Sequence, residues 1–303
     1  MIVPPPLKKG DSVALFAPAR AVKQSELTEA ILILESWGLN VKIPNLLFET
    51  YHQFAGDSDL RVKQVQSVLD DQEVNAMIAV RGGYGCSKIV DRLDFTEVVK
   101  NPKWLIGFSD LTVFLGQMYN LGLCSIHGPV ALLLNQDGGS CSAKRLNNLL
   151  FSKNPSFELI SQKPKFYKEG VAAGDLVGGN LSVLVNQIGT ASFPKLKGNI
   201  LFIEDLDEYI YHIDRMFTQL DRIGAFEQLH GVVIGHMSSM HDNTIPFGGD
   251  ALKIIDATLS HHKLPYATGF EIGHECTNHS VIVGQKVVLT VSKEKAQLIN
   301  KSF

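Results

Sequence analysis

One stretch decides the fold: Lys103-Trp104-Leu105-Ile106-Gly107-Phe108-Ser109-Asp110-Leu111-Thr112. A short apolar run ends at Gly107, Ser109 follows two residues later, and residues 113–121 then have the pattern of a helix. A serine at a strand-to-helix turn presents a free hydroxyl, and the N–H after it points at the group under attack. The same position also suits a helix N-cap, because serine accepts hydrogen bonds from a first helical turn.

The rest of the chain supplies an acid and a base for such a serine. Glu204 ends the apolar run 199–203, and His274 follows Gly273. Serine, then acid, then histidine is the chain order of α/β-hydrolases. The sequence therefore predicts Ser109 as nucleophile, Glu204 as triad acid and His274 as base.

The first half of the chain alternates apolar runs with amphipathic segments. We expect strands at 12–17, 40–43, 74–80 and 104–106, and helices at 25–37, 61–69 and 113–121. Such alternation predicts a parallel, doubly wound sheet. Ligands bind at the carboxyl ends of its strands, where both Gly82-Gly83 and Ser109 fall.

The second half follows a weakly patterned, turn-rich segment. We expect a first domain at 1–131, a linker without long apolar elements at 132–173 and a second domain at 174–303. The second domain shows strand patterns at 199–203 and 231–235, a helix pattern at 209–222 and a strand pair at 285–299.

A glycine loop, Arg81-Gly82-Gly83-Tyr84-Gly85, follows the strand expected at 74–80. It matches neither the dinucleotide pattern G-x-G-x-x-G nor a phosphate loop ending in Gly-Lys-Ser/Thr. Two interpretations remain. Its backbone N–H forms an oxyanion hole together with the N–H after the nucleophile, or the glycines serve a tight turn with positive φ.

Composition limits the classes of function. The chain has 303 residues with a formal net charge of −3 and no dominant basic patch, which argues against nucleic acid as a partner. No apolar run reaches membrane-spanning length, so we expect no membrane partner. Prolines occupy the N-terminus where a signal peptide would be apolar, which predicts a cytoplasmic protein. The four cysteines form no C-x-x-C pair and are expected to be free thiols.

Several motifs together resemble the LD-carboxypeptidase family of serine peptidases. They are, in chain order, Arg81-Gly82-Gly83-Tyr84-Gly85, Gly107-Phe108-Ser109-Asp110, Gly178-Gly179-Asn180-Leu181, Glu204-Asp205 and Gly273-His274. The likeness spans nearly the whole chain. It implies an α/β fold: an N-terminal parallel sheet similar to class I glutamine amidotransferases, with helices on both faces, and a smaller C-terminal domain rich in β structure.

The resemblance also implies the chemistry. Ser109, Glu204 and His274 match the catalytic triad, and the N–H groups of Gly83 and Asp110 match the oxyanion hole. The implied reaction removes a terminal D-amino acid from an L-centre, as in meso-diaminopimelate, for recycling of cell-wall peptides. The expected partner is a small peptide substrate; we expect a homodimer, and neither a cofactor nor a metal. The alternative is a peptidase like the microcin C immunity protein, acting on peptidyl-aminoacyl nucleotides.

A substrate contact is also suggested by chemistry. A carboxypeptidase must pair the terminal carboxylate of its substrate with donors, and arginine binds carboxylates bidentately. Arg81, at the mouth of the glycine loop, is the candidate; bracing of the loop through backbone carbonyls is its alternative role.

The residues argue against three other functions, of which the first is metal-dependent hydrolysis. His274, Glu275 and His279 resemble H-E-x-x-H, but the two histidines are five residues apart and would lie about 140° apart around a helix. A glutamine amidotransferase would need cysteine at the position of Ser109. A binding module that retains only the fold is the third possibility, and the intact triad residues argue against it.

Overall fold

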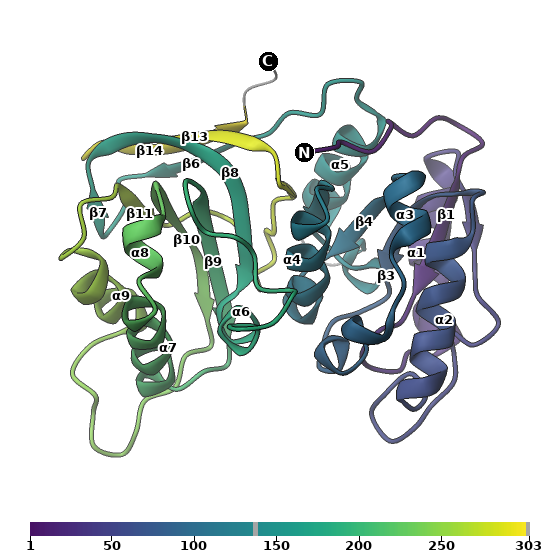
Figure 1. Ribbon diagram of the computed structural model, residues 1–303, viewed down its shortest axis with the longest axis horizontal. Coiled ribbons are helices and arrows are strands. Elements are labelled where there is room, and N and C mark those ends of the chain that lie inside the picture. The colour runs from purple at the N-terminus through teal and green to yellow at the C-terminus, as the bar shows by residue number, and fades with distance from the viewer. Residues whose placement is uncertain (136–138, 301–303) are drawn as a thin grey trace.

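A six-stranded sheet is built mainly from the first half of the chain (Figure 1). The computed structural model describes residues 1–135 and 139–300. Five parallel strands are joined at the outer side of β5 by the antiparallel strand β12, so that the order is β12-β5-β4-β3-β1-β2. The strands are β1 (Ser12–Phe16), β2 (Asn40–Lys42), β3 (Val74–Ala79), β4 (Trp104–Gly107), β5 (Ser125–His127) and β12 (Val281–Val283).

Four helices connect the parallel strands. They are α1 (Thr28–Ser36), α2 (Ser58–Asp70), α3 (Thr96–Lys100) and α4 (Thr112–Asn120). The chain steps from β1 to β2 in one direction and from β2 through β3, β4 and β5 in the other. Because parallel crossovers are right-handed, α1 lies on the face opposite α2, α3 and α4. The predicted doubly wound parallel sheet is confirmed, whereas its likeness to glutamine amidotransferases stays a prediction.

An eight-stranded mixed sheet forms the second half, in the order β6-β14-β13-β8-β9-β10-β11-β7. Its central strands are parallel: β8 (Gly170–Asn180), β9 (Ile200–Leu206), β10 (Gly231–Ser238) and β11 (Tyr266–Thr268). The outer strands are antiparallel: β6 (Glu158–Gln162), β7 (Tyr167–Lys168), β13 (Lys286–Val291) and β14 (Lys295–Asn300). The predicted β-rich C-terminal domain is confirmed.

Helices on this second sheet enclose a separate core. They are α6 (Leu181–Asn186), α7 (Ile210–Arg222), α8 (Ala225–Gln228) and α9 (Ala251–Leu259). The apolar face predicted for 209–222 is buried: Ile213, Phe217 and Leu220 are inaccessible to solvent. Within the described residues, no helix is long and apolar enough to cross a bilayer.

The segment 132–173 is more regular than expected. It holds helix α5 (Gly139–Phe151) and strands β6 and β7, and β8 begins at Gly170, although the sequence shows no long apolar element there. In β6 burial alternates but polarity does not, because Ser161 is buried and Ile160 is exposed, so the strand has no period-2 apolar pattern in the sequence. The domain boundaries stay a prediction; residues 136–138 lie outside the described residues.

Helix α4 joins the two halves (Figure 1). A Cβ at Gly116 would lie 2.1 Å from the carbonyl oxygen of Ser192, so only glycine allows this close approach. The Nδ2 of Asn120 donates to the carbonyls of Ala191 and Phe193, at 2.8 Å each. The helix that begins just after Ser109 is therefore fixed to the second domain.

Candidate active site

Ser109 occupies a strained turn between β4 and α4. Its φ is +64°, a left-handed conformation that costs a non-glycine residue roughly 1–2 kcal/mol. The N-cap of α4 is Leu111, so the helix-cap interpretation of Ser109 is wrong. Strain of this kind is typical of a nucleophile held on a sharp turn.

The glycine loop lies directly against this turn. A Cβ at Gly82 would lie 3.0 Å from Cβ and 3.2 Å from Oγ of Ser109, so the absence of a side chain admits the serine. Gly83 has a φ of +121°. The Cys86 N–H, at the end of the loop, donates to Oδ2 of Asp110 at 2.9 Å. The loop and the turn thus form one connected unit, and the oxyanion role of Gly83 and Asp110 stays a prediction.

Burial raises the pKa values of Asp110 and Cys86, the two residues that connect the loop with the turn. Burial raises the pKa of Asp110, although the N–H of Cys86 favours its charged form. Burial also raises the pKa of the Cys86 thiol, which is inaccessible to solvent. All four cysteines are free, as predicted.

Glu204 and His274 form the closest charged pair of the site. Nδ1 of His274 lies 2.6 Å from Oε2 of Glu204, whose side chain is fully buried near the carboxyl end of β9. Burial lowers the pKa of His274, but the hydrogen bond and charge of Glu204 outweigh it and the net pKa is raised. Because Nδ1 faces the carboxylate, Nε2 is the nitrogen left for proton exchange.

Two glycines make room for the buried carboxylate. A Cβ at Gly273, which has a φ of +121°, would lie 2.7 Å from Oε2 of Glu204. A Cβ at Gly235 on β10 would lie 2.4 Å from the carbonyl oxygen of Ile272 and 3.3 Å from Cβ of Glu204. The chain can therefore bring His274 onto Glu204 only because these positions lack side chains.

An aromatic ring connects the serine turn with the histidine. The ring of Phe108, the residue before Ser109, lies 4.7 Å from the imidazole of His274 between centroids. It also lies 5.8 Å from the ring of His127 at the end of β5. Burial lowers the pKa of His127 to about 4, so this imidazole is neutral near the site at neutral pH. Phe108 thus places the turn that carries Ser109 beside the pair of His274 and Glu204.

The polar segment after His274 holds the histidine turn in place. Oδ1 of Asn278 accepts the Gly273 N–H at 3.0 Å, and Oε1 of Glu275 accepts the hydroxyl of Ser238 at 2.7 Å. His279 lies with Nε2 3.5 Å from Glu271. These contacts close a loop around His274 in place of the helix that a zinc motif of the type H-E-x-x-H requires.

Two arginines lie at the glycine loop. Arg81 donates from Nη1 to the carbonyl of Ala21 at 3.3 Å, in line with the bracing alternative, and its role in binding substrate stays a prediction. No sequence pattern points to Arg20, yet the stem of its side chain lies over Gly83: a Cβ on Gly83 would lie 2.6 Å from Cδ of Arg20.

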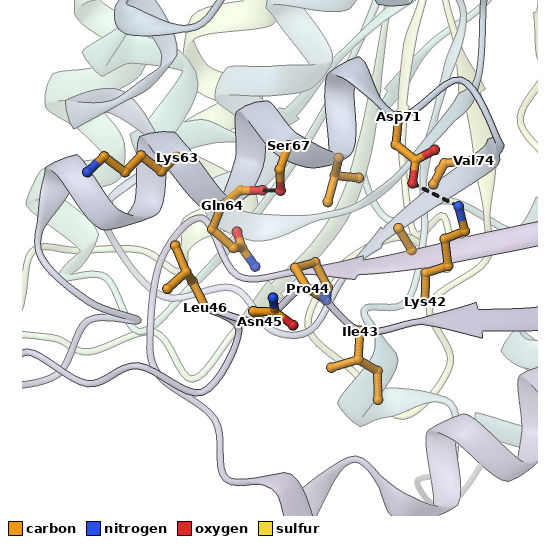
Figure 2. Close-up of a pocket in the computed structure, with 12 residues that line it drawn as sticks. Lys42, Ile43, Pro44, Asn45, Leu46, Lys63, Gln64, Ser67, Asp71 and Val74 are labelled. Carbon is orange, nitrogen blue, oxygen red and sulfur yellow. Dashed lines mark hydrogen bonds and ion pairs between the residues drawn. The ribbon is translucent and has the colours of Figure 1, made fainter.

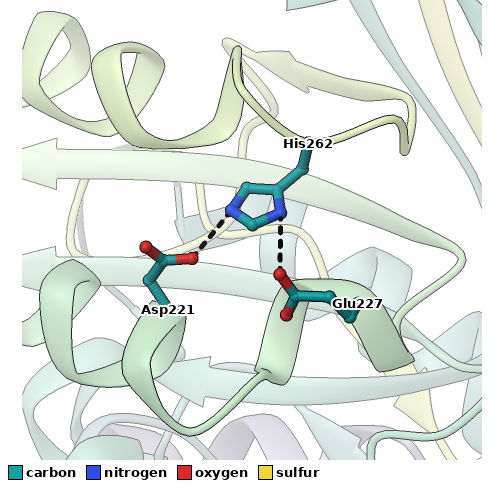
Figure 3. Close-up of side chains that lie close together, drawn as sticks. All are labelled: Asp221, Glu227 and His262. Atoms are coloured by element: carbon teal, nitrogen blue, oxygen red, sulfur yellow. Dashed lines mark ion pairs between the residues drawn. The ribbon is translucent and has the colours of Figure 1, made fainter.

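A group of side chains of the types that can bind metal ions lies in the second domain, apart from the predicted triad. Asp221, Glu227 and His262 gather within 4.8 Å (Figure 3). Nε2 of His262 lies 2.8 Å from Asp221 and Nδ1 lies 3.5 Å from Glu227, so each ring nitrogen faces a carboxylate. This arrangement is that of an imidazole bridging α7 and α8, and none of the predicted triad residues belongs to it.

A pocket of about 610 Å³ lies at the β2 edge of the first sheet (Figure 2). Its lining comes from residues 42–46 and from α2, and Lys42 is paired there with Asp71 at 2.8 Å. Ser109, Glu204 and His274 do not line this pocket.

Comparison with known proteins agrees with this geometry. The N-terminal domain of LD-carboxypeptidases matches residues 13–128, and the C-terminal domain matches residues 173–289. The chain belongs to the LD-carboxypeptidase family. The two matched segments carry Ser109 on one side and Glu204 and His274 on the other.

Individual relatives cover nearly the whole chain. A probable murein peptide carboxypeptidase of Bacillus subtilis is 32% identical over 97% of this chain and 93% of its own. The crystal structure of muramoyltetrapeptide carboxypeptidase from Oxalobacter formigenes superposes with a TM-score of 0.85 at 28% identity, covering 96% of this chain and 99% of that one. The microcin C7 self-immunity protein of Escherichia coli is 22% identical over 94% of this chain and 92% of its own.

Proposed function

We propose that this member of the LD-carboxypeptidase family is a serine carboxypeptidase of murein peptides. It cleaves the bond between an L-centre, of the meso-diaminopimelate type, and a terminal D-amino acid. One observation carries the proposal: the buried Glu204–His274 pair, 2.6 Å apart, lies beside the turn where Ser109 is held at positive φ. The names of the murein carboxypeptidases among its relatives support the choice of substrate.

The residues divide the reaction into two acyl-transfer steps. Nε2 of His274 takes the Ser109 hydroxyl proton as Oγ attacks the scissile carbonyl, and Glu204 stabilises the imidazolium through Nδ1. The N–H groups of Gly83 and Asp110 stabilise the oxyanion. His274 then protonates the leaving amine, the D-amino acid departs, and water hydrolyses the acyl-enzyme on Ser109.

Recognition of the terminal carboxylate needs a cation beside the glycine loop. Arg81 is the residue that we propose for this role, because a guanidinium binds a carboxylate in a bidentate manner. Loss of its bond to Ala21, 3.3 Å long, would free Nη1 for the substrate.

A comparison of three peptides tests the substrate. We expect release of alanine from L-Ala-γ-D-Glu-meso-diaminopimelate-D-Ala and far slower cleavage of its C-terminal L-Ala epimer and of its C-terminal amide. Equal cleavage of all three would show a general peptidase or amidase. Aminoacyl-sulfamoyl adenosine, assayed beside them, tests the microcin-type alternative.

Two further properties belong to this proposal. A triad needs no metal, so activity should survive exhaustive treatment with EDTA; loss on chelation that zinc restores would contradict the serine mechanism. We also propose a cytoplasmic homodimer, which cell fractionation and light scattering would test.

A further inference from the structure

The side chain of Thr112 connects the serine turn to the second domain. Its hydroxyl donates to the carbonyl oxygen of Ser109 at 2.7 Å and accepts the backbone N–H of Asn180 at 2.9 Å. Thr112 begins α4 in the first domain, whereas Asn180 ends β8 in the second. A hydroxyl has one hydrogen to donate, and here that hydrogen is committed to Ser109.

At its second-domain end, this connection reaches the strand position of Glu204. In the parallel ladder between β8 and β9, Asn180 is the register partner of Glu204. The connection therefore runs from the Ser109 carbonyl through the Thr112 hydroxyl and the Asn180 backbone to the strand position of the acid. Glu204 then contacts His274, so the connection links all three predicted catalytic residues across the domain interface.

The surroundings of Thr112 are built to hold this hydroxyl. The side chain is 2% exposed. A Cβ at Gly179 would lie 2.4 Å from Oγ1 of Thr112, and a Cβ at Gly178 would lie 1.9 Å from the carbonyl oxygen of Phe202. The two glycines before Asn180 thus let β8 approach both the threonine and β9. Asp205 holds the side chain of Asn180 in place, because its Oδ1 accepts a hydrogen bond from Nδ2 of Asn180 at 2.7 Å.

We propose that Thr112 is a positioning residue, whose hydroxyl sets the distance between the nucleophile and the acid–base pair. The two groups come from different domains, and a misplacement of about 1 Å costs on the order of 100-fold in rate. This inference deepens the proposed function and rests on its assignment of Ser109, Glu204 and His274.

The test compares substitutions of Thr112 that keep or remove the hydroxyl. We expect Thr112→Val, which has nearly the same shape, to lower kcat and the rate of Ser109 labelling by a fluorophosphonate on the order of 10- to 100-fold. KM should stay within about threefold, because substrate contacts are untouched. Thr112→Ser retains the hydroxyl and should keep both rates within about threefold of wild type.

Thr190→Val is the control for loss of a threonine hydroxyl. Oγ1 of Thr190 donates to the carbonyl of Gln187 at 2.8 Å, the same three-residue spacing, but within the second domain. Because Thr190 is exposed and Thr112 is buried, we expect a smaller thermal destabilisation than in Thr112→Val and a labelling rate near wild type. The acid limb of the pH profile should not move in either variant, because the Glu204–His274 pair remains.

Wild-type labelling and kcat in a folded Thr112→Val protein would overturn the proposal. If Thr112→Val does not fold, Thr112→Ala takes its place in the same comparison, because the smaller side chain cannot clash. The labelling rate requires no peptide. If the wild type reacts with the fluorophosphonate but leaves the murein tetrapeptide intact, the proposed substrate fails while the comparison at Thr112 still decides this inference.

Discussion

At the scale of single residues, backbone conformation and burial define the site. Ser109 holds a positive φ that serine rarely adopts, and the structure tolerates it because the Gly82 backbone, Leu111 and Thr112 surround the turn. Glu204 is fully buried with one oxygen on His274. Both features cost the folded state free energy, and such costs are concentrated at functional sites.

Substitutions at Ser109 separate this strain from catalysis. We expect Ser109→Ala and Ser109→Gly both to lose on the order of 10⁴- to 10⁶-fold in kcat. Glycine adopts positive φ freely, so Ser109→Gly should be more stable to urea than Ser109→Ala by about 1 kcal/mol. Retention of more than roughly a tenth of the activity in either variant would rule out Ser109 as nucleophile.

The pH profile reports the pair of Glu204 and His274. The pKa of His274 is raised by Glu204, so activity in the wild type falls as the pH drops through this raised value and the base becomes protonated. Glu204→Gln removes the charge that favours the imidazolium. We expect a lower kcat together with an acid limb of kcat/KM displaced to lower pH. An acid limb that stays in place would show that another group titrates.

At the scale of elements, glycines decide how closely strands and loops approach the site. Gly235 and Gly273 lie against Glu204, and Gly178 and Gly179 lie against β9 and Thr112. Each contact joins segments distant in the chain. The parallel strand ends meet there, and side chains on the neighbouring turns would separate them.

A pair of alanine substitutions isolates this packing from backbone strain. Gly273→Ala places a Cβ 2.7 Å from Oε2 of Glu204 at a φ of +121°, whereas Gly248→Ala meets nothing within 4 Å at a φ of +104°. We expect each to lose about 1 kcal/mol from strain. Only Gly273→Ala should also lower kcat, on the order of 100-fold. Equal activities in the two variants would contradict the role of Gly273 in seating the acid.

At the scale of the whole molecule, the proposed catalytic residues come from both sides of an interface between two sheets. Ser109 belongs to the first, Glu204 to the second, and α4 and Thr112 connect them. The chain also returns after His274 to add β12 beside β5, so residues from the C-terminal half complete the first sheet. Neither half is structurally closed without the other.

Separate expression of the halves tests this dependence. Residues 1–131 lack Glu204, His274 and β12, and their β5 edge would be unpaired and prone to association. We expect this fragment to show no turnover of the murein tetrapeptide and a tendency to aggregate, measured by assay and by size-exclusion chromatography. Full activity of the fragment alone would exclude Glu204 and His274 from the reaction.

Features that depend on neighbouring residues could be predicted from the sequence. Apolar periodicity predicted the parallel strands and helices of the first half and the amphipathic α7, because those patterns repeat within a few residues. The order of Ser109, Glu204 and His274 predicted which residues to examine. The run of glycines at 82–85 predicted a loop after β3, and the structure places that loop against Ser109.

The contacts between those residues depend on the packing of the two domains. The bond from Asn180 to Thr112 spans 68 positions, and β12 joins β5 from more than 150 positions away along the chain. Contacts of this range depend on how two sheets pack and leave no periodic trace in the sequence. The positive φ of Ser109, the space that Gly273 leaves for Glu204 and the link through Thr112 therefore become visible only once both domains are folded together.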